Sequence, residues 1–325
     1  MEENVFENRV DLTALNTSIG KIREEIGKVI VGQEAMIDLL ITAILADGHV
    51  LIEGVPGVAK TLTAKLLSKV IDVNFSRVQF TPDLMPSDVI GTSIFNVKKS
   101  EFEFKSGPIF SNIVLIDEIN RAPAKTQAAL FEVMEERQVT VDGTTYPMQH
   151  PYMVVATQNP IEHEGTYRLP EAQLDRFLFK IIVAYPDLEQ EVSIITGHHA
   201  RKGVNAAMAV EPVLSATQIG LYRQAVQQVY IEDHLIRYVA QIIHETRSSP
   251  ALFLGASPRA SIALLNGAKA YAAVNGRDFV TPEDIKRIAL PVLRHRVMMT
   301  PDKEMEGATA DEIVKQIVDK IEVPR

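Results

Sequence analysis

The stretch "HVLIEGVPGVAKTLTAKLLSKVI", from His49 to Ile71, places a glycine-rich loop between a predicted strand and a predicted helix. The loop "GVPGVAKT" nearly matches the phosphate-binding pattern G-x-x-x-x-G-K-[ST], except that Ala59 takes the place of the second glycine. Such a loop curls backbone N–H groups around phosphates at a helix N-terminus, where the helix dipole favours anions. Lys60 would then reach the β- and γ-phosphates and Thr61 would bind Mg²⁺. The stretch predicts a nucleotide site, with a chance proline-glycine turn as the alternative.

The departure from the pattern at Ala59 is small. Alanine adds only a methyl group where glycine is usual. We expect this methyl group to be tolerated if Ala59 has a negative φ, as a residue at a helix start does. A bulky side chain at the same place would crowd the phosphate.

Polar side chains follow two further apolar strand candidates. "NIVLIDEIN" places Asp117 and Glu118 at the end of a fully apolar run, where packing gives no reason for two carboxylates. In a P-loop ATPase an aspartate here helps to hold Mg²⁺, and a following glutamate orients the attacking water. "VVATQNP" puts Asn159 at a strand end, facing the crevice where open α/β sheets bind ligands. The alternatives are an acidic helix cap for the first stretch and an Asn-Pro turn for the second.

Two arginines stand at places that suit phosphoryl transfer. "LPEAQLDRF" puts Arg176 just before a strand candidate, and "GASPRAS" puts Arg259 at the start of a helix. The guanidinium fork suits the spread negative charge of the transferred phosphoryl group. Either arginine taken alone is more often a surface ion pair, so both assignments depend on the surrounding motifs.

The order of strand and helix patterns predicts two domains. Apolar runs alternate with helical patterns in the first half, which is typical of a parallel α/β sheet, and five runs are strand candidates. "SIFNVKKSEFEFKSGPIF" predicts a β-hairpin insert at about 89–107. From Ser215 onward the pattern is almost wholly helical. We predict an α/β nucleotide-binding core over residues 1–185 and a smaller all-helical domain with a C-terminal helix over 186–325.

The composition excludes several classes of protein. The 325 residues are 46% hydrophobic and 23% charged, as in a folded globular protein. The absence of cysteine excludes disulfides, thiol catalysis and zinc–thiolate sites. A net charge of −9 argues against a surface built broadly for nucleic acid. No apolar stretch has the length or the flanks of a signal or a membrane span, so we expect a soluble, cytoplasmic protein without membrane insertion.

These motifs together resemble those of an AAA+ ATPase, and more narrowly those of the MoxR family. The similar blocks run from "VIVGQE" near the start to "LPVLRHRV" near residue 297, and include "LIDEINRAPAKTQAALFEVMEERQVT", "ATQNP", "EGTYRLPEAQLDRF" and "GASPRAS". Alanine before the lysine is a common form of the loop in that family. The resemblance implies a P-loop AAA+ core with a parallel five-stranded sheet, a helical lid, and the helix-2 insert at the hairpin.

The resemblance also implies which residues bind ATP and Mg²⁺. Lys60 and Thr61 correspond to the Walker A lysine and the Mg²⁺ ligand, and Asp117 to the Walker B aspartate, a second metal ligand. Glu118 corresponds to the catalytic base. The implied nucleotide-binding residues are Val31, Gly32, Gln33, Gly54, Val55, Pro56, Gly57, Val58, Ala59, Lys60, Thr61 and Leu62.

Three more catalytic residues follow from the same resemblance. Asn159 corresponds to sensor 1, Arg176 to the arginine finger that acts on a neighbouring subunit, and Arg259 to sensor 2. Arg168, where family members often carry proline, and Arg121 are further candidates for the finger.

The expected function is ATP hydrolysis that drives the remodelling, maturation or assembly of partner proteins. The resemblance implies a homo-oligomer, most simply a hexameric ring, and a client protein, together with a partner that carries a von Willebrand factor A domain. The alternative is a nucleic-acid motor, as in the helicases that share the hairpin insert, with Lys98, Lys99 and Lys105 lining a pore. The acidic charge and the lack of a DNA-binding module make nucleic acid the weaker hypothesis.

Overall fold

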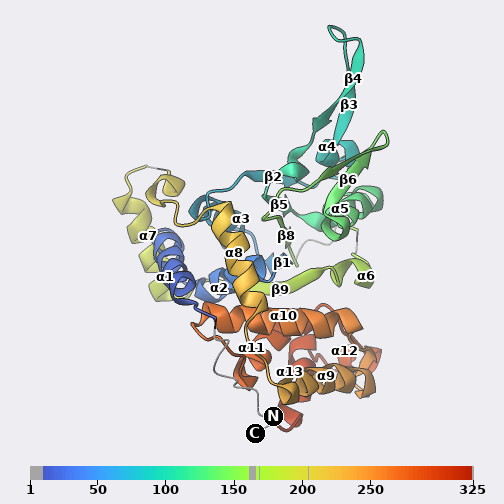
Figure 1. Ribbon diagram of the computed structural model, residues 1–325. Coiled ribbons are helices and arrows are strands. Elements are labelled where there is room, and N and C mark those ends of the chain that lie inside the picture. Colours follow the sequence, from blue (N-terminus) through green and yellow to red (C-terminus); the bar gives the residue numbers. More distant parts are fainter. Residues whose placement is uncertain (1–9, 161–165, 168, 204, 324–325) are drawn as a thin grey trace, which may run out of the picture.

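A five-stranded parallel sheet forms the centre of the computed structural model, which describes residues 10–160, 166–167, 169–203 and 205–323 (Figure 1). The strands lie in the order β2-β5-β8-β1-β9, and every neighbouring pair is parallel. Their bounds are β1 His49–Gly54, β2 Phe75–Gln79, β5 Ile113–Asp117, β8 Met153–Gln158 and β9 Phe177–Val183. All five strands predicted from the sequence are therefore confirmed.

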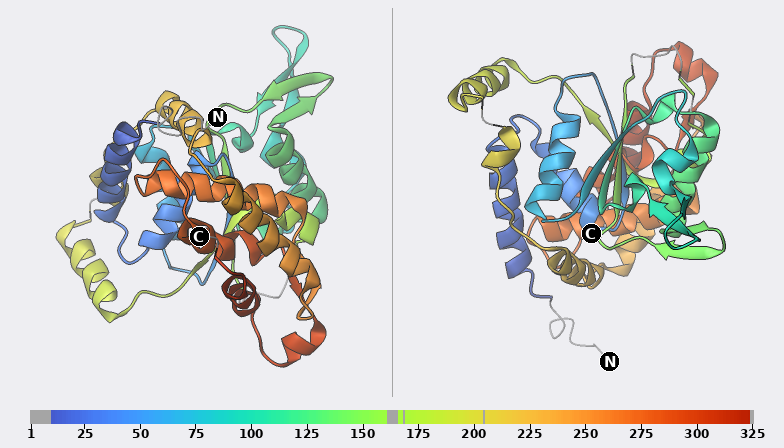
Figure 2. Two further views of the ribbon diagram at one scale, coloured as in Figure 1. Left: turned by 60° about the horizontal axis from the view of Figure 1, so that its bottom comes forward. Right: turned by 90° about the horizontal axis from the view of Figure 1, so that it is seen from above.

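Both faces of the sheet are buried along its three central strands, β5, β8 and β1, which explains why these strands are mainly apolar. Along β1, Val50 and Ile52 belong to one hydrophobic cluster and Leu51 belongs to another. The first cluster contains the helices α1 Thr13–Gly27, α2 Glu34–Leu45 and α3 Lys60–Val70, and the second contains α5 Ala124–Glu136. Figure 2 shows the sheet edge-on between these two helical layers.

Two β-hairpins and several short helical segments are inserted in the second helical layer. The strands β3 Gly91–Asn96 and β4 Glu101–Ser106 form an antiparallel hairpin that projects from the core at the top of Figure 1. A second hairpin, which the sequence patterns did not indicate, joins β6 Gln138–Val141 to β7 Thr144–Pro147. Short helical segments complete this layer: α4 Pro86–Ile90, η1 Pro108–Phe110, η2 Ile119–Arg121 and α6 Glu171–Leu174.

Helices dominate the chain after β9. They are α7 Leu188–Ala200, η3 Ala206–Ala209, α8 Ala216–Gln227, α9 Asp233–Ser248, α10 Pro258–Val274, α11 Pro282–Leu293, α12 Pro301–Met305 and α13 Ala310–Lys320. A small strand pair, β10 Leu252–Leu254 with β11 Met298–Met299, is an addition to the all-helical pattern that we predicted. Helix α10 packs on α2 and α11 packs on β9, so these helices share a hydrophobic core with the sheet (Figure 1). Among the described residues, no helix is both long and apolar enough to cross a membrane.

Candidate functional site

The glycine-rich loop turns the chain from β1 into α3 through left-handed backbone conformations. Gly57 has φ 90°, and Ala59, the residue before α3, has φ 61° and ψ 17°. The expectation of a negative φ at Ala59 is therefore wrong. A sharp turn between a strand and a helix requires positive φ values, which glycine adopts at no steric cost. The cost of alanine here is backbone strain.

Lys60 and Thr61 open α3 directly under this turn. The Nζ atom of Lys60 donates hydrogen bonds to the carbonyls of Gly54 and Val55, the second at 3.0 Å, so the ammonium lies inside the curve of the loop. The Thr61 hydroxyl lies 3.4 Å from Oδ1 of Asp117, at the end of β5. A hydroxyl and a carboxylate side by side form an oxygen pair of the kind that Mg²⁺ prefers.

Asp117 is buried and held by side chains from both neighbouring strands. Its Oδ2 pairs with Nε of Arg77 on β2 at 2.6 Å, and its Oδ1 accepts from the hydroxyl of Thr157 on β8 at 3.1 Å. Because β5 lies between β2 and β8, parallel register brings the ends of all three strands together. A buried carboxylate with a cationic partner and a donor hydroxyl is kept in one orientation.

Glu118 follows Asp117 in a left-handed conformation, with φ 56°. Its backbone N–H donates to the Thr157 hydroxyl at 3.1 Å. Its Oε2 accepts from Nε2 of Gln79 at 2.6 Å and pairs with Nε of Arg121 at 3.1 Å. Non-glycine residues with positive φ concentrate at functional sites, where the surrounding structure holds the strain.

These groups surround one cavity of about 360 Å³. The lining residues come from the loop and α3, from β2, and from the ends of β5 and β8: Pro56, Gly57, Ala59, Lys60, Thr61, Leu62, Arg77, Gln79, Asp117, Glu118, Thr157, Gln158 and Asn159. The predicted residues Lys60, Thr61, Asp117, Glu118 and Asn159 therefore meet at one place.

The predicted site residues left out four polar residues of this cavity, namely Arg77, Gln79, Thr157 and Gln158. The stretch "FSRVQF" carried a signal for two of them, because Arg77 and Gln79 alternate with apolar residues and so lie on one side of β2. Their partners, Asp117 at the end of β5 and Glu118 directly after it, could be known only from the strand order.

The remaining predicted nucleotide-binding residues lie away from the cavity wall. Val58 is buried in the hydrophobic core, and Gly54 and Val55 contribute backbone carbonyls to Lys60. Gln33 donates to the carbonyl of Ala184 at 3.4 Å, just after β9. The neighbouring residues of that segment, Val31 and Gly32, are also partly exposed beside it.

The two predicted catalytic arginines occupy a different cavity, of about 260 Å³, whose lining shares no residue with the first. Arg176 precedes β9 and Arg259 lies in the first turn of α10. Both pair with Glu135 on α5: Oε2 lies 3.6 Å from Nε of Arg176 and Oε1 lies 2.8 Å from Nη2 of Arg259. The structure thus brings the two arginines together, but does not bring either to the phosphate-binding loop of its own chain.

The other two candidates for the arginine finger are Arg121 and Arg168. Arg121 pairs with Glu118 of its own chain, which lines the first cavity. Arg168 lies outside the described residues.

Comparisons with known proteins agree with this geometry. Residues 49–179 match the model of the ATPase family associated with various cellular activities (AAA), and residues 244–317 match that of the AAA lid domain. Chaperone MoxR1 of Mycobacterium tuberculosis is 46% identical over 90% of this chain and 78% of its own length. YeaC of Bacillus subtilis, an uncharacterized protein, is 47% identical over 95% of this chain and 96% of its own length.

A crystal structure supports the same relationship at the level of the fold. A protein of Cytophaga hutchinsonii, provisionally assigned as an ATPase, superimposes with a TM-score of 0.89 and 43% identity. The match covers 96% of this chain and 97% of the other. Sequence identity of this extent, over nearly the whole chain, shows a family relationship and not only a shared fold. The chain is a nucleotide-binding ATPase and belongs to the MoxR family of AAA+ proteins.

Proposed function

We propose that this ATPase works as an oligomer, with a hexameric ring as the simplest form, in which each subunit supplies arginines to its neighbour's nucleotide. The separation of the two cavities carries this proposal. The phosphate-binding loop, Asp117 and Glu118 line one cavity, whereas Arg176 and Arg259 line another. Arginines that are to stabilise the charge of phosphoryl transfer must reach the phosphates. A second copy of the chain is the natural source of that contact.

Within one subunit, the first cavity fits ATP with Mg²⁺. The amides of the loop and the N-terminus of α3 suit the phosphates, and Lys60 adds a positive charge inside the turn. Thr61 and Asp117 would hold Mg²⁺, which when bound would neutralise charge on the phosphates. Glu118 would orient and deprotonate the attacking water, and Asn159 would hold that water or the γ-phosphate.

The arginine assignment follows from the pairs that are seen. Arg121 pairs with Glu118, so its guanidinium group is engaged with the catalytic glutamate of its own chain. Arg176 and Arg259 lie together at a cavity with about a quarter and about half of their side chains exposed. Arg176 is therefore a better candidate for the arginine finger than Arg121, and Arg259 lies beside it at the same cavity.

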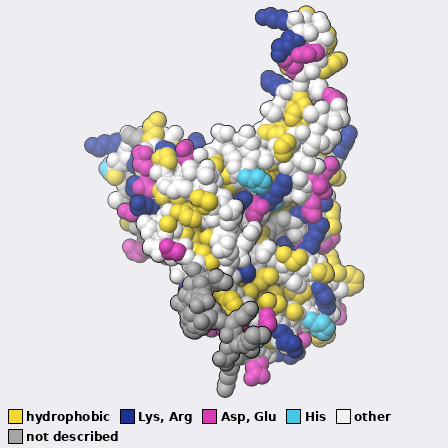
Figure 3. All heavy atoms as spheres, in the orientation of Figure 1, with side chains coloured by type: hydrophobic (Ala, Val, Ile, Leu, Met, Phe, Trp, Pro, Cys, Tyr) yellow, Lys and Arg dark blue, Asp and Glu magenta, His cyan; other side chains and the backbone are white. Residues whose placement is uncertain are grey.

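The work done by hydrolysis, in this proposal, is the remodelling of a client protein. The relative from Mycobacterium tuberculosis is called a chaperone. The projecting hairpin carries four exposed large hydrophobic side chains, at Ile94, Phe95, Val97 and Phe102. Figure 3 shows it standing away from the body of the molecule, with both cationic and acidic side chains near its tip. Exposed apolar side chains gathered on one element mark a contact with another protein.

Mixing of subunits tests the shared site. Arg176→Ala subunits should bind ATP and hydrolyse it slowly, while Lys60→Ala subunits should not bind it. In mixed rings, the intact cavity of the first can meet the intact arginines of the second, so part of the ATPase activity should return. Mixed rings whose assembly is demonstrated, but whose activity stays at the level of the separate variants, would count against the trans arrangement.

Capture with Glu118→Gln tests the client. A variant that binds ATP but does not hydrolyse it should keep its partner through purification, and a captured protein with a von Willebrand factor A domain would agree with the family resemblance. Recovery of nucleic acid without a consistent protein, or stimulation of the ATPase by DNA, would favour the nucleic-acid motor instead.

A further inference from the structure

The carboxylate of Glu135 lies between the two arginines that we assign to the neighbouring nucleotide. It accepts from Nη2 of Arg259 at 2.8 Å and lies 3.6 Å from Nε of Arg176. Two guanidinium groups this close repel each other, and one shared carboxylate offsets that repulsion. Each guanidinium carries five N–H donors, so contact with Glu135 leaves others to bind a phosphate.

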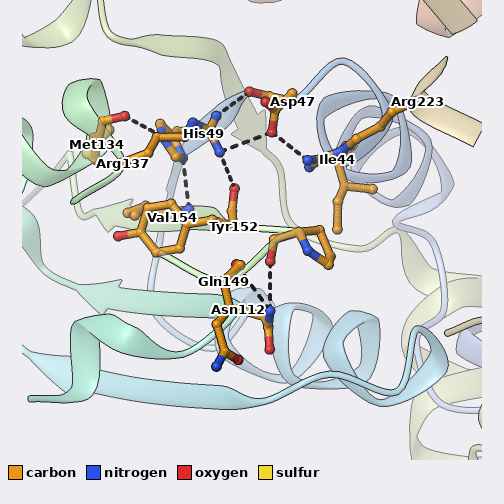
Figure 4. Close-up of polar contacts among 11 residues, drawn as sticks. Ile44, Asp47, His49, Asn112, Met134, Arg137, Gln149, Tyr152, Val154 and Arg223 are labelled. Carbon is orange, nitrogen blue, oxygen red and sulfur yellow. Dashed lines mark hydrogen bonds and ion pairs between the residues drawn. The ribbon is translucent and has the colours of Figure 1, made fainter. Parts of the chain in front are cut away.

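The backbone that carries Glu135 is fixed to the sheet by polar contacts, shown in Figure 4. The carbonyl of Met134 accepts from Nε2 of His49 at 3.1 Å, and Nδ1 of His49 accepts from the backbone N–H of Val154 at 3.0 Å. Arg137 donates to the carbonyl of Tyr152 at 3.0 Å and pairs with Asp47 at 3.0 Å. The last turn of α5 is therefore joined to the beginnings of β1 and β8.

The backbones of the two arginines are fixed by a second carboxylate. Oδ1 of Asp175 pairs with Nε of Arg296 at 2.7 Å, and its Oδ2 accepts from the hydroxyl of Ser257 at 2.9 Å. Ser257 is the N-cap of α10, two residues before Arg259, and Asp175 immediately precedes Arg176. Both arginines therefore start from fixed points. Nη1 of Arg176 also donates to the carbonyl of Phe131 on α5, so Glu135 and Phe131 together set the direction of that guanidinium group, whereas Arg259 pairs with Glu135 at 2.8 Å.

We propose that Glu135 is a positioning residue that orients Arg176 and Arg259 as a pair toward the nucleotide of the neighbouring subunit. The inference rests on the proposed function, because it requires both arginines to act across the subunit interface. Glu135 itself touches no nucleotide. It acts on turnover by holding the guanidiniums in the direction in which they meet the γ-phosphate.

The test compares Glu135→Gln with Glu136→Gln, a matched control on the same turn of α5 that the structure pairs with neither arginine. Misplacement by about 1 Å costs on the order of 10²-fold in rate. We therefore expect kcat of Glu135→Gln to fall about 10-fold to 100-fold. The dissociation constant for ATP and the melting temperature should stay near wild type, because the phosphate cavity is separate. Glu135→Asp, which keeps the charge, should recover part of kcat.

Two further measurements separate positioning from a structural role. In a chain that already carries Arg176→Ala and Arg259→Ala, Glu135→Gln should lower kcat no further, because its targets are gone. Mixed with Lys60→Ala subunits, Glu135→Gln subunits should regain activity as Arg176→Ala subunits do. A full additional loss in the arginine-free chain, or a drop in melting temperature that accounts for the lost activity, would overturn the inference.

The outcomes also distinguish this inference from the proposal on which it rests. If Arg176→Ala lowers kcat and is rescued by mixing, while Glu135→Gln behaves like Glu136→Gln, the trans arrangement holds and the positioning role is wrong. If Arg176→Ala keeps the wild-type kcat, the trans arrangement fails, and the role of Glu135 fails with it.

Discussion

Replacing Ala59 by glycine should stabilise the protein, because Ala59 is held in a left-handed conformation. Its φ of 61° and ψ of 17° lie in the region where the Cβ of an L-residue approaches the following carbonyl oxygen. Glycine has no Cβ and adopts this conformation freely. Ala59→Gly therefore removes strain from the folded protein and leaves the course of the loop unchanged.

The expected gain is the difference between two effects. A left-handed L-residue costs about 1–2 kcal/mol. Glycine loses more conformational entropy on folding, at a cost of about 0.5–1 kcal/mol. The free energy of unfolding should rise by roughly 0.5–1 kcal/mol, which for a chain of this size corresponds to about 1–3 °C in melting temperature. Affinity for ATP should stay near wild type, because the lysine and the amides of the loop are unchanged.

Thermal unfolding and ATP titration of three variants check this reasoning. Gly57→Ala is a control that should change the free energy of unfolding in the opposite direction. Gly57 has φ 90°, and no heavy atom lies within 4 Å of an added Cβ, so the substitution introduces backbone strain without a steric clash. By the same two effects taken with the opposite sign, it should lower the free energy of unfolding by roughly 0.5–1 kcal/mol. Ala59→Val, with a β-branched side chain at positive φ, should lose both stability and ATP affinity. A melting temperature that falls in Ala59→Gly, or stays unchanged in Gly57→Ala, would refute the left-handed loop.

Three other predictions concern the site and its support. Lys60→Ala should lose ATP binding, as measured by calorimetry. Glu118→Gln should bind ATP but release phosphate about 10²–10⁴-fold more slowly, because it has lost the general base. Equal loss of binding in both variants would contradict their separate roles. Thr157→Val keeps the shape but removes the hydroxyl between Asp117 and the Glu118 N–H, so urea unfolding should show a loss of about 1–3 kcal/mol. Burial, and then the charge of a nearby arginine, lower the pKa of His49 from 6.5 to about 3, so below pH 6.5 the unfolded chain binds a proton that the folded one does not. The free energy of unfolding should thus fall by about 2 kcal/mol between pH 6.5 and pH 5, and His49→Gln should remove that share of the pH dependence; equal slopes in both proteins would be the contrary result.

The sequence by itself determined the features that depend on neighbours along the chain. A glycine loop between a strand and a helix can be recognised because its chemistry requires a short, continuous set of residues. Asp117, Glu118 and Asn159 could be placed because polar residues at the ends of buried parallel strands all face the same edge of a sheet. The central strands were found from their apolar runs, since both faces of the sheet are covered there.

The tertiary structure alone decided which side chains from distant segments meet. Arg77 contacts Asp117 only because β2 pairs with β5, and Glu135 holds Arg176 and Arg259 only because α5, β9 and α10 converge at one cavity. It also set the sign of φ at Ala59, which is positive although the start of a helix favours a negative value. The physical reason is the same in each case. Local patterns record the conformational preferences of a segment, whereas pairing and strain arise where segments far apart in the chain are packed together.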